Sequence, residues 1–490
     1  MLGGTRVPEA EAQSATALTE EGLRRALSPF HALAIVVGAV VGTGIYIRPA
    51  IIAQQVHTPG RLIAVWCVAG LLSLAGALTF AELTARFPRS GGEYVFLRET
   101  LGELPAFLFG WMRLTVGVGT LAAMGAGVAV FFTDLVPLPR TMWHFALPSP
   151  NGVLAIDIGY RQAVAVVFIL LLALLNVSGV ARAGRFQGFV TVAKVLGLVG
   201  LIGALVFFAP PSAAPAGLAV EPTSPAPDLI AYGVALLAAM AAYNGWAQAP
   251  MVAGEVRDPR RTLPLTLIAG VLIATLLYLV VNAAFLHVVS FDDIVASSST
   301  LHPDAPSVAS RAVARLPSVH AGRALTLLFL VSAVGTLHCN LLLPSRVLFA
   351  MARDSLLPKR LSGIAQSART PAAAILTLAA MGMTLAALSG YDRLSNMSVF
   401  GNLTFYAVSA AGLIRWRYRH PMQEKPVFVT PRGVAELFLV ATIILLVALV
   451  AGGRVEVLAG LGLMALGLPV YVGILAARHF AERAPGPTPQ

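Results

Sequence analysis

The chain has 490 residues, of which 57% are hydrophobic and only 12% are charged, and its mean hydropathy is +0.80. Because soluble domains carry about 25% charged residues, this composition indicates an integral membrane protein. The formal net charge of +11 lies mainly in short loops between apolar stretches, which argues for the lipid bilayer as partner and against nucleic acid.

The N-terminal segment is polar and lacks the apolar core of a cleavable signal peptide. We therefore interpret residues 1–27 as a cytosolic tail and expect the first apolar stretch to direct insertion. The two cysteines, Cys67 and Cys339, lie in apolar stretches without a CxxC or CxxH neighbour. The sequence thus indicates neither a disulfide nor a zinc site, and we expect no metal and no cofactor.

About twelve apolar stretches approach the length of roughly 20 residues that a membrane-spanning helix needs. Their approximate limits are 30–54, 61–84, 104–134, 161–180, 186–208, 229–253, 264–288, 323–350, 371–388, 394–414, 434–451 and 456–477. Of the 34 lysines and arginines, 23 lie in the tails and loops on one side of these stretches. Because the more basic side faces the cytoplasm, we predict a multi-pass plasma membrane protein, in a bacterium the inner membrane, with both termini cytoplasmic.

Two of the apolar stretches are interrupted. In the first, Thr43 stands between Gly42 and Gly44, and in the sixth, Asn244 and Gly245 break the run from Leu236 to Trp246. A glycine break in the middle of a bilayer frees N–H and C=O groups that hydrocarbon cannot satisfy, so each break must line a cavity or bind a polar group. The alternative is that these glycines only let helices pack closely.

The positions of the two breaks match if five stretches form one unit, because an odd number of spans inverts the next unit across the bilayer. Broken helices at corresponding positions of inverted halves indicate the central site of a secondary transporter. The N-termini of the half-helices offer N–H groups to an anion, and their C-termini offer carbonyls to a cation. An α-amino acid carries both charges, so we predict that it is the substrate.

The chain also resembles a known family. Four motifs carry the resemblance: Val41-Gly-Thr-Gly-Ile-Tyr46; Phe80-Ala-Glu-Leu83 with Pro88-Arg-Ser-Gly-Gly-Glu-Tyr94; Tyr243-Asn-Gly-Trp246 with Gly254-Glu-Val-Arg-Asp-Pro-Arg-Arg-Thr-Leu-Pro264; and Ser345-Arg-Val-Leu-Phe-Ala-Met-Ala-Arg-Asp-Ser-Leu-Leu-Pro358. They resemble the amino acid/polyamine/organocation superfamily, and most closely its L-type amino acid transporter branch, over residues 30 to about 420.

The resemblance implies an all-α membrane protein with the leucine-transporter-type fold. Residues 28–208 and 209–414 then form two inverted five-helix repeats, 415–477 form two peripheral helices, and 478–490 form a cytosolic tail. The substrate carboxylate meets the amides around Gly42, and its ammonium meets carbonyls near Val41, Ala241 and Tyr243. The implied substrate-binding set is Val41, Gly42, Thr43, Gly44, Ile45, Ala241, Tyr243, Asn244, Gly245 and Trp246. The branch often has an aromatic lid where Ala241 stands, so here the lid is missing or supplied by Trp246.

Lys194 stands inside the predicted fifth span. A charged amine there costs about 2.5–3.5 kcal/mol on insertion scales, so it needs a partner or a role. Relatives carry a lysine at the matching position, where its ammonium takes the place of a sodium ion between the first and eighth spans, and this implies sodium-independent transport. Two other interpretations are a proton carrier and a lysine that snorkels to the inner face.

Other polar residues fall inside predicted spans. We expect Asn340 to face Lys194 and His338 to be either a proton-coupling group or a packing residue. Asn402 faces the cavity or bonds a neighbouring helix, whereas Arg113 is expected to snorkel to the inner face. Among charges near the inner helix ends, Glu82 and Glu255, with Arg86, Arg257 and Arg346 nearby, are candidates for an inner gate.

The sequence lacks GxxxxGK[ST], HExxH and GxSxG motifs, so it argues against an enzyme and against an ATP-driven pump. We predict a sodium-independent amino acid transporter, with neutral substrates, that works by alternating access as an exchanger, uniporter or proton symporter. A permease for polyamines or other organic cations and a non-transporting amino acid sensor stay open as alternatives. Oligomeric state and any ancillary subunit are also open, and no predicted external loop holds a cysteine that could tether one.

Overall fold

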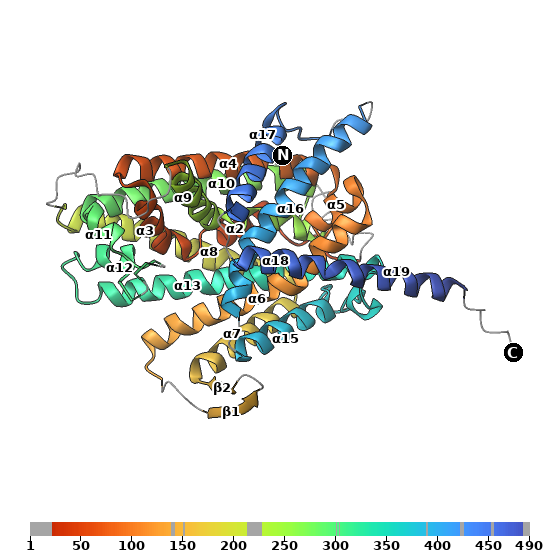
Figure 1. The fold of residues 1–490 in the computed structure, drawn as a ribbon, viewed down its shortest axis with the longest axis horizontal. Helices are drawn as coiled ribbons and strands as arrows, with labels where there is room; N and C mark the ends of the chain where they lie inside the picture. Colours follow the sequence, from red (N-terminus) through yellow and green to blue (C-terminus); the bar gives the residue numbers. More distant parts are fainter. Residues whose placement is uncertain are drawn as a thin grey trace, which may run out of the picture.

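A computed structural model of the chain describes residues 22–138, 143–149, 152–212, 228–299, 301–302, 304–388, 391–421, 426–451 and 455–483. Helices dominate these residues, as predicted. The exception is one antiparallel hairpin, β1 (Trp143–Ser149) and β2 (Gly152–Ile158), whose register pairs Trp143 with Ile158 and Ser149 with Gly152. The hairpin lies beyond the ends of two long helices, at the edge of the molecule (Figure 1).

The first half of the chain forms α2 (Pro29–Val40), α3 (Gly44–Val56), α4 (Pro59–Arg86), α5 (Glu93–Leu101), α6 (Glu103–Leu135), α7 (Tyr160–Val177) and α8 (Val180–Phe208). The second half forms α9 (Asp228–Tyr243), η1 (Trp246–Glu255), α10 (Pro259–Val288), α11 (Phe291–Val295), α12 (Val308–Val313), α13 (Ala321–Leu342), α14 (Pro344–Arg353), η2 (Lys359–Ser362), α15 (Ala372–Leu388) and α16 (Tyr391–Arg419). The C-terminal helices are α17 (Val434–Ala451), α18 (Val455–Ala465) and α19 (Gly467–Arg483).

Nine helical segments of the described chain are long and apolar enough to cross a membrane, and the bent pair α2–α3 brings the number to ten. Two more of the predicted stretches coincide with α15, a shorter apolar helix of 17 residues, and with α16, which has 29 residues. The chain is therefore a multi-pass membrane protein.

Both predicted interruptions are present. Helix α2 begins at Pro29, where Ser28 caps its N-terminus, and it ends at Val40. Its continuation α3 begins at Gly44 and is bent by 42° from it. In the second interruption, α9 ends at Tyr243 and the chain resumes as the 3₁₀ segment η1. A mid-span 3₁₀ stretch is typical of functional breaks.

Long helices from the two halves of the chain pack in pairs. Helix α4 lies against α10, α3 against α9, α6 against α13, and α7 against α15. Helices α4 and α10 run side by side along one side of the molecule (Figure 1). This arrangement brings the two breaks, α2–α3 and α9–η1, to the same place.

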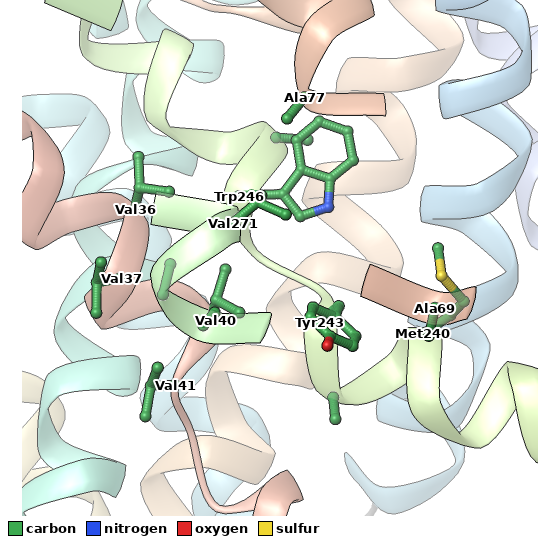
Figure 2. Packing of buried hydrophobic residues seen from close by; sticks show 14 of the residues in the cluster. Val36, Val37, Val40, Val41, Ala69, Ala77, Met240, Tyr243, Trp246 and Val271 are labelled. Carbon is green, nitrogen blue, oxygen red and sulfur yellow. The ribbon is translucent and has the colours of Figure 1, made fainter. Parts of the chain in front are cut away.

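The buried core beside the breaks is built largely of valine, alanine and aromatic side chains (Figure 2). Trp246 is only 1% exposed and packs edge-on against Phe80, with ring centroids 5.1 Å apart. Tyr406 and Phe438 contact the same indole. Trp246 thus joins η1 to three other helices.

We expect the substitution Trp246→Ala to lower the free energy of unfolding by about 3–5 kcal/mol, because it empties a large core site. Thermal unfolding of the purified protein in detergent measures this loss. An unchanged melting temperature would contradict the core assignment of Trp246.

Candidate functional site

A cavity of about 180 Å³ lies between the two helix breaks. Residues of both breaks form part of its wall, and α6, α13, α14 and α16 also contribute. Its polar lining comprises Thr43, Arg48, Arg113, Thr120, Asn244, Gln248, Thr336, Asn340, Ser398 and Asn402. Sites for drug-sized ligands have roughly 300–1,000 Å³, so this cavity suits a small polar solute.

The carbonyl groups freed where α2 ends are bound by side chains of other helices. Lys194 of α8 donates from Nζ to Gly38 O at 2.6 Å and to Val41 O at 2.7 Å. The Tyr278 hydroxyl of α10 lies 2.8 Å from Val40 O and 3.0 Å from Ala242 O, and these two carbonyls share its one proton in a bifurcated hydrogen bond. These two side chains meet the hydrogen-bonding demand that hydrocarbon cannot meet.

The amide ends of the two breaks are arranged differently. Thr43 is the N-cap of α3 and Gly245 is the N-cap of η1, and neither makes a side-chain capping hydrogen bond. The first amides of a helix have no partner within the helix and carry its positive dipole end. Both N-caps line the cavity, which therefore offers N–H groups to an anionic group.

Gly245 is where the two breaks come into closest contact. Its φ is +128°, a conformation that side-chain-bearing residues rarely adopt, and a Cβ atom there would lie 2.6 Å from Ala39 O. Glycine is required at this position both by backbone conformation and by the proximity of α2.

The structure places some of the predicted binding residues on the cavity and others behind it. Gly42, Thr43, Gly44, Ala241, Asn244 and Gly245 line it, whereas Val41, Ile45, Tyr243 and Trp246 do not. The Tyr243 hydroxyl turns to Trp66 O at 3.2 Å, and the Trp246 indole lies in the core (Figure 2). Trp246 is thus no lid over this cavity, because its ring packs away from the lining.

The predicted coupling residues lie in separate environments. Lys194 is 1% exposed. The residue of α13 beside its ammonium is Gly335, where an added Cβ atom would lie 3.5 Å from Nζ. Asn340 instead lines the cavity and donates from Nδ2 to Thr336 O at 3.0 Å. His338 is fully buried behind the cavity, with Nδ1 2.8 Å from Gln187 Oε1. These contacts favour the packing interpretation of His338.

The expectation that Arg113 snorkels to the membrane surface is wrong. Arg113 is 4% exposed and lines the cavity, and its Nη2 lies 3.9 Å from Glu93 Oε2. Glu93 belongs to the short helix α5, which is mostly buried rather than lying on the surface. Burial raises the pKa of Glu93 to about 8, and the attraction of Arg113 and a hydrogen bond from Ser409 oppose this shift.

Two charge clusters were candidates for one inner gate, and the structure separates them. Glu255 of η1 and Arg346 of α14 are both fully buried and form a bidentate pair with distances of 2.8 and 3.0 Å. Glu82 of α4 instead binds Arg86 and Arg417. The first cluster joins the η1 break to the end of the eighth predicted span, whereas the second ties α4 to α16.

A second cavity of about 550 Å³ shares Thr43 with the first. It lies between α3, α6, α12 and the start of α13, on the opposite side of the break from Glu255 and Arg346, and Tyr46 and Phe329 form part of its wall. Thr43 therefore stands between the inner cavity and a wider vestibule.

Comparison with known proteins gives a family for the chain. Residues 27–468 match the family model for amino acid permeases. The serine/threonine exchanger SteT of Bacillus subtilis (strain 168) is 30% identical over 465 residues, which cover 93% of this chain and 98% of that protein. The large neutral amino acids transporter small subunit 2 of Mus musculus is 28% identical over 96% of this chain and 84% of its own length. The cystine/glutamate transporter of Homo sapiens is 26% identical over 85% and 78%, respectively.

We expect Gly245→Ala to lower the free energy of unfolding by about 1–3 kcal/mol, because the side chain forces a strained φ and meets Ala39 O. Gly200→Ala is the matched control, since a Cβ at Gly200 of α8 meets nothing within 4 Å. Thermal unfolding of the two variants side by side measures the difference. Equal melting temperatures would contradict the close approach of the two breaks.

Proposed function

Because the chain belongs to the amino acid permease family and is therefore a transporter rather than an enzyme, we propose that it exchanges small neutral amino acids across the membrane without sodium. The observation that carries this proposal is the cavity between two helix breaks, where uncapped amide ends meet carbonyls already bound by Lys194 and Tyr278.

The α-carboxylate of the substrate binds the amide end of α3. Thr43 leaves that helix end without a side-chain cap, and backbone N–H groups at a helix N-terminus bind anions well. The α-ammonium lies toward the C-terminal end of α9, where Ala241 lines the cavity. Val41 O is already bound by Lys194, so we assign it no direct role in holding the substrate.

Lys194 supplies the positive charge that a sodium ion supplies in sodium-coupled transporters. Its ammonium links the end of α2 to α8 and lies beside Gly335 of α13. A cation that is part of the polypeptide keeps the broken helix in place without being transported, so substrate transport does not require a sodium gradient.

The size of the cavity and the relatives favour small neutral substrates. About 180 Å³ leaves little room beyond the α-carboxylate and α-ammonium. The named relatives include a serine/threonine exchanger. A polyamine is disfavoured because Arg113 lines the cavity and repels a second positive charge.

Alternating access follows from a two-fold inverted repeat. The pairs α4–α10, α6–α13 and α7–α15 each join helices at matching positions of the two predicted five-helix halves, which supports the 28–208 and 209–414 repeats, with twelve spans in total. In the described conformation the Glu255–Arg346 pair closes one side, and the vestibule beside Thr43 marks the other. Rocking of one bundle against the other then opens the closed side.

We assign the closed side to the cytoplasm, because the positive-inside rule puts the tails and the basic loops there. This orientation leaves both termini inside the cell, in the inner membrane of a bacterium. The two cysteines lie in α4 and α13, away from the predicted external loops, so we propose that the transporter works without a disulfide-linked partner.

Exchange is tested by counterflow in proteoliposomes. Vesicles loaded with unlabelled L-threonine are expected to take up external labelled L-threonine at least about tenfold faster than empty vesicles, because the loaded carrier returns faster than the empty one. Equal uptake in loaded and empty vesicles would contradict exchange.

Sodium independence is tested with the same vesicles. We expect the same uptake rate when choline or potassium replaces sodium. We also expect a loss of uptake in Lys194→Met, because that substitution removes the ammonium from Gly38 O and leaves Val41 O only the long 3.4 Å hydrogen bond from Ser332. A strict sodium requirement of the wild-type protein would refute the role given to Lys194.

A further inference from the structure

Several buried polar atoms around the cavity have no hydrogen-bond partner in the described part of the chain. They include Nε and Nη2 of Arg113, Oε1 of Gln248 and Oδ1 of Asn402. These residues come from α6, η1 and α16, and all three line the cavity. A buried polar group without a partner costs about 1–3 kcal/mol, so a cluster of them next to a substrate site indicates that the ligand supplies the missing bonds.

Arg113 is the only one of the three that carries a charge, and its surroundings do not saturate it. Its Nη2 is 3.9 Å from Glu93 Oε2, which is too far for a hydrogen bond. The Phe109 ring lies 5.2 Å from the guanidinium carbon and supplies only a π face. The guanidinium therefore keeps N–H groups that can donate hydrogen bonds to a substrate oxygen.

The side-chain amides of Gln248 and Asn402 add hydrogen-bond acceptors to the donors of Arg113. Each carboxamide has a donor end and an acceptor end, and Arg113 has donors only. A side chain that both accepts and donates, such as a hydroxyl, satisfies the cluster best. A methyl group at the same place leaves all of these atoms without partners, because it offers neither.

Resting on the exchange function proposed above, we propose that Arg113, Gln248 and Asn402 form the subsite for the substrate side chain and that it selects short side chains bearing a hydroxyl. The α-carboxylate and α-ammonium stay at the two helix breaks, and the side chain extends from them toward α6 and α16. Arg113 is the specificity-determining residue of this subsite, since it holds the hydroxyl oxygen with a charged donor.

Isosteric pairs of amino acids test this assignment. Threonine and valine differ by one hydroxyl in place of a methyl, as do serine and 2-aminobutyrate. A hydrogen bond to a charged group corresponds to roughly 10- to 100-fold in affinity. We expect the hydroxyl member of each pair to compete that much better for counterflow of labelled threonine by the wild-type protein.

The variants compare Glu93→Gln with the double variant Glu93→Gln/Arg113→Met. The glutamine background avoids leaving a buried carboxylate without its cation. We expect the single variant to keep a preference for the hydroxyl and the double variant to bind both members of each pair within about twofold. Ligand-induced thermal stabilisation in detergent gives the same ratios if a variant no longer transports.

The outcomes separate this inference from the proposed function. If the wild type shows no preference within the pairs, or the double variant keeps it, the side-chain subsite is wrong although amino acid exchange stands. A uniform loss of affinity for all four amino acids would mean that Arg113 binds the α-carboxylate, and this overturns the assignment. If no amino acid is transported or bound by the wild type, the proposed function itself fails.

Discussion

A helix that is broken inside a bilayer leaves peptide groups without partners, and the lipid cannot supply them. In this protein, side chains of neighbouring helices donate hydrogen bonds to the freed carbonyl groups. Lys194 and Tyr278 reach from α8 and α10 to the carbonyls of Gly38, Val40 and Val41. The amide side is left open toward the cavity, where Thr43 and Gly245 begin the second halves of the broken helices without side-chain caps. This asymmetry supports the proposed binding of a ligand with an anionic end.

The positive charges inside the molecule have different roles because they have different neighbours. Lys194 binds backbone carbonyls and holds the broken helix. Arg346 donates to the Glu255 carboxylate, Ser345 and Leu342 O, and so joins α14 to η1. Arg113 faces Glu93 without a hydrogen bond and borders the cavity. Of these three residues, only Arg113 lines the cavity, and its Nε and Nη2 have no hydrogen-bond partner in the described part of the chain.

The sequence predicted the breaks and the buried lysine because glycine pairs and charged residues are rare inside apolar membrane helices, and each therefore stands out. It predicted part of the cavity lining, but it did not separate the residues that face the cavity from those that turn away, since that depends on helix rotation. Tyr243 and Trp246 adjoin the break in sequence, yet they point into the core (Figure 2). The role of Arg113 was missed because Glu93 lies on another helix, twenty positions earlier in the chain, and periodicity does not report that proximity. The β1–β2 hairpin was not predicted, because the prediction rested on apolar stretches of helical length and the hairpin lies between two of them.

We propose that an amino acid binds between the two broken helices, with its carboxylate on the amide end of α3. An experimental structure of the purified protein with bound L-threonine tests it most directly. We expect ligand density in the cavity, with carboxylate oxygens within hydrogen-bond distance of the backbone N–H groups around Thr43. Threonine bound elsewhere, or a continuous helix through residues 29–56, would contradict it.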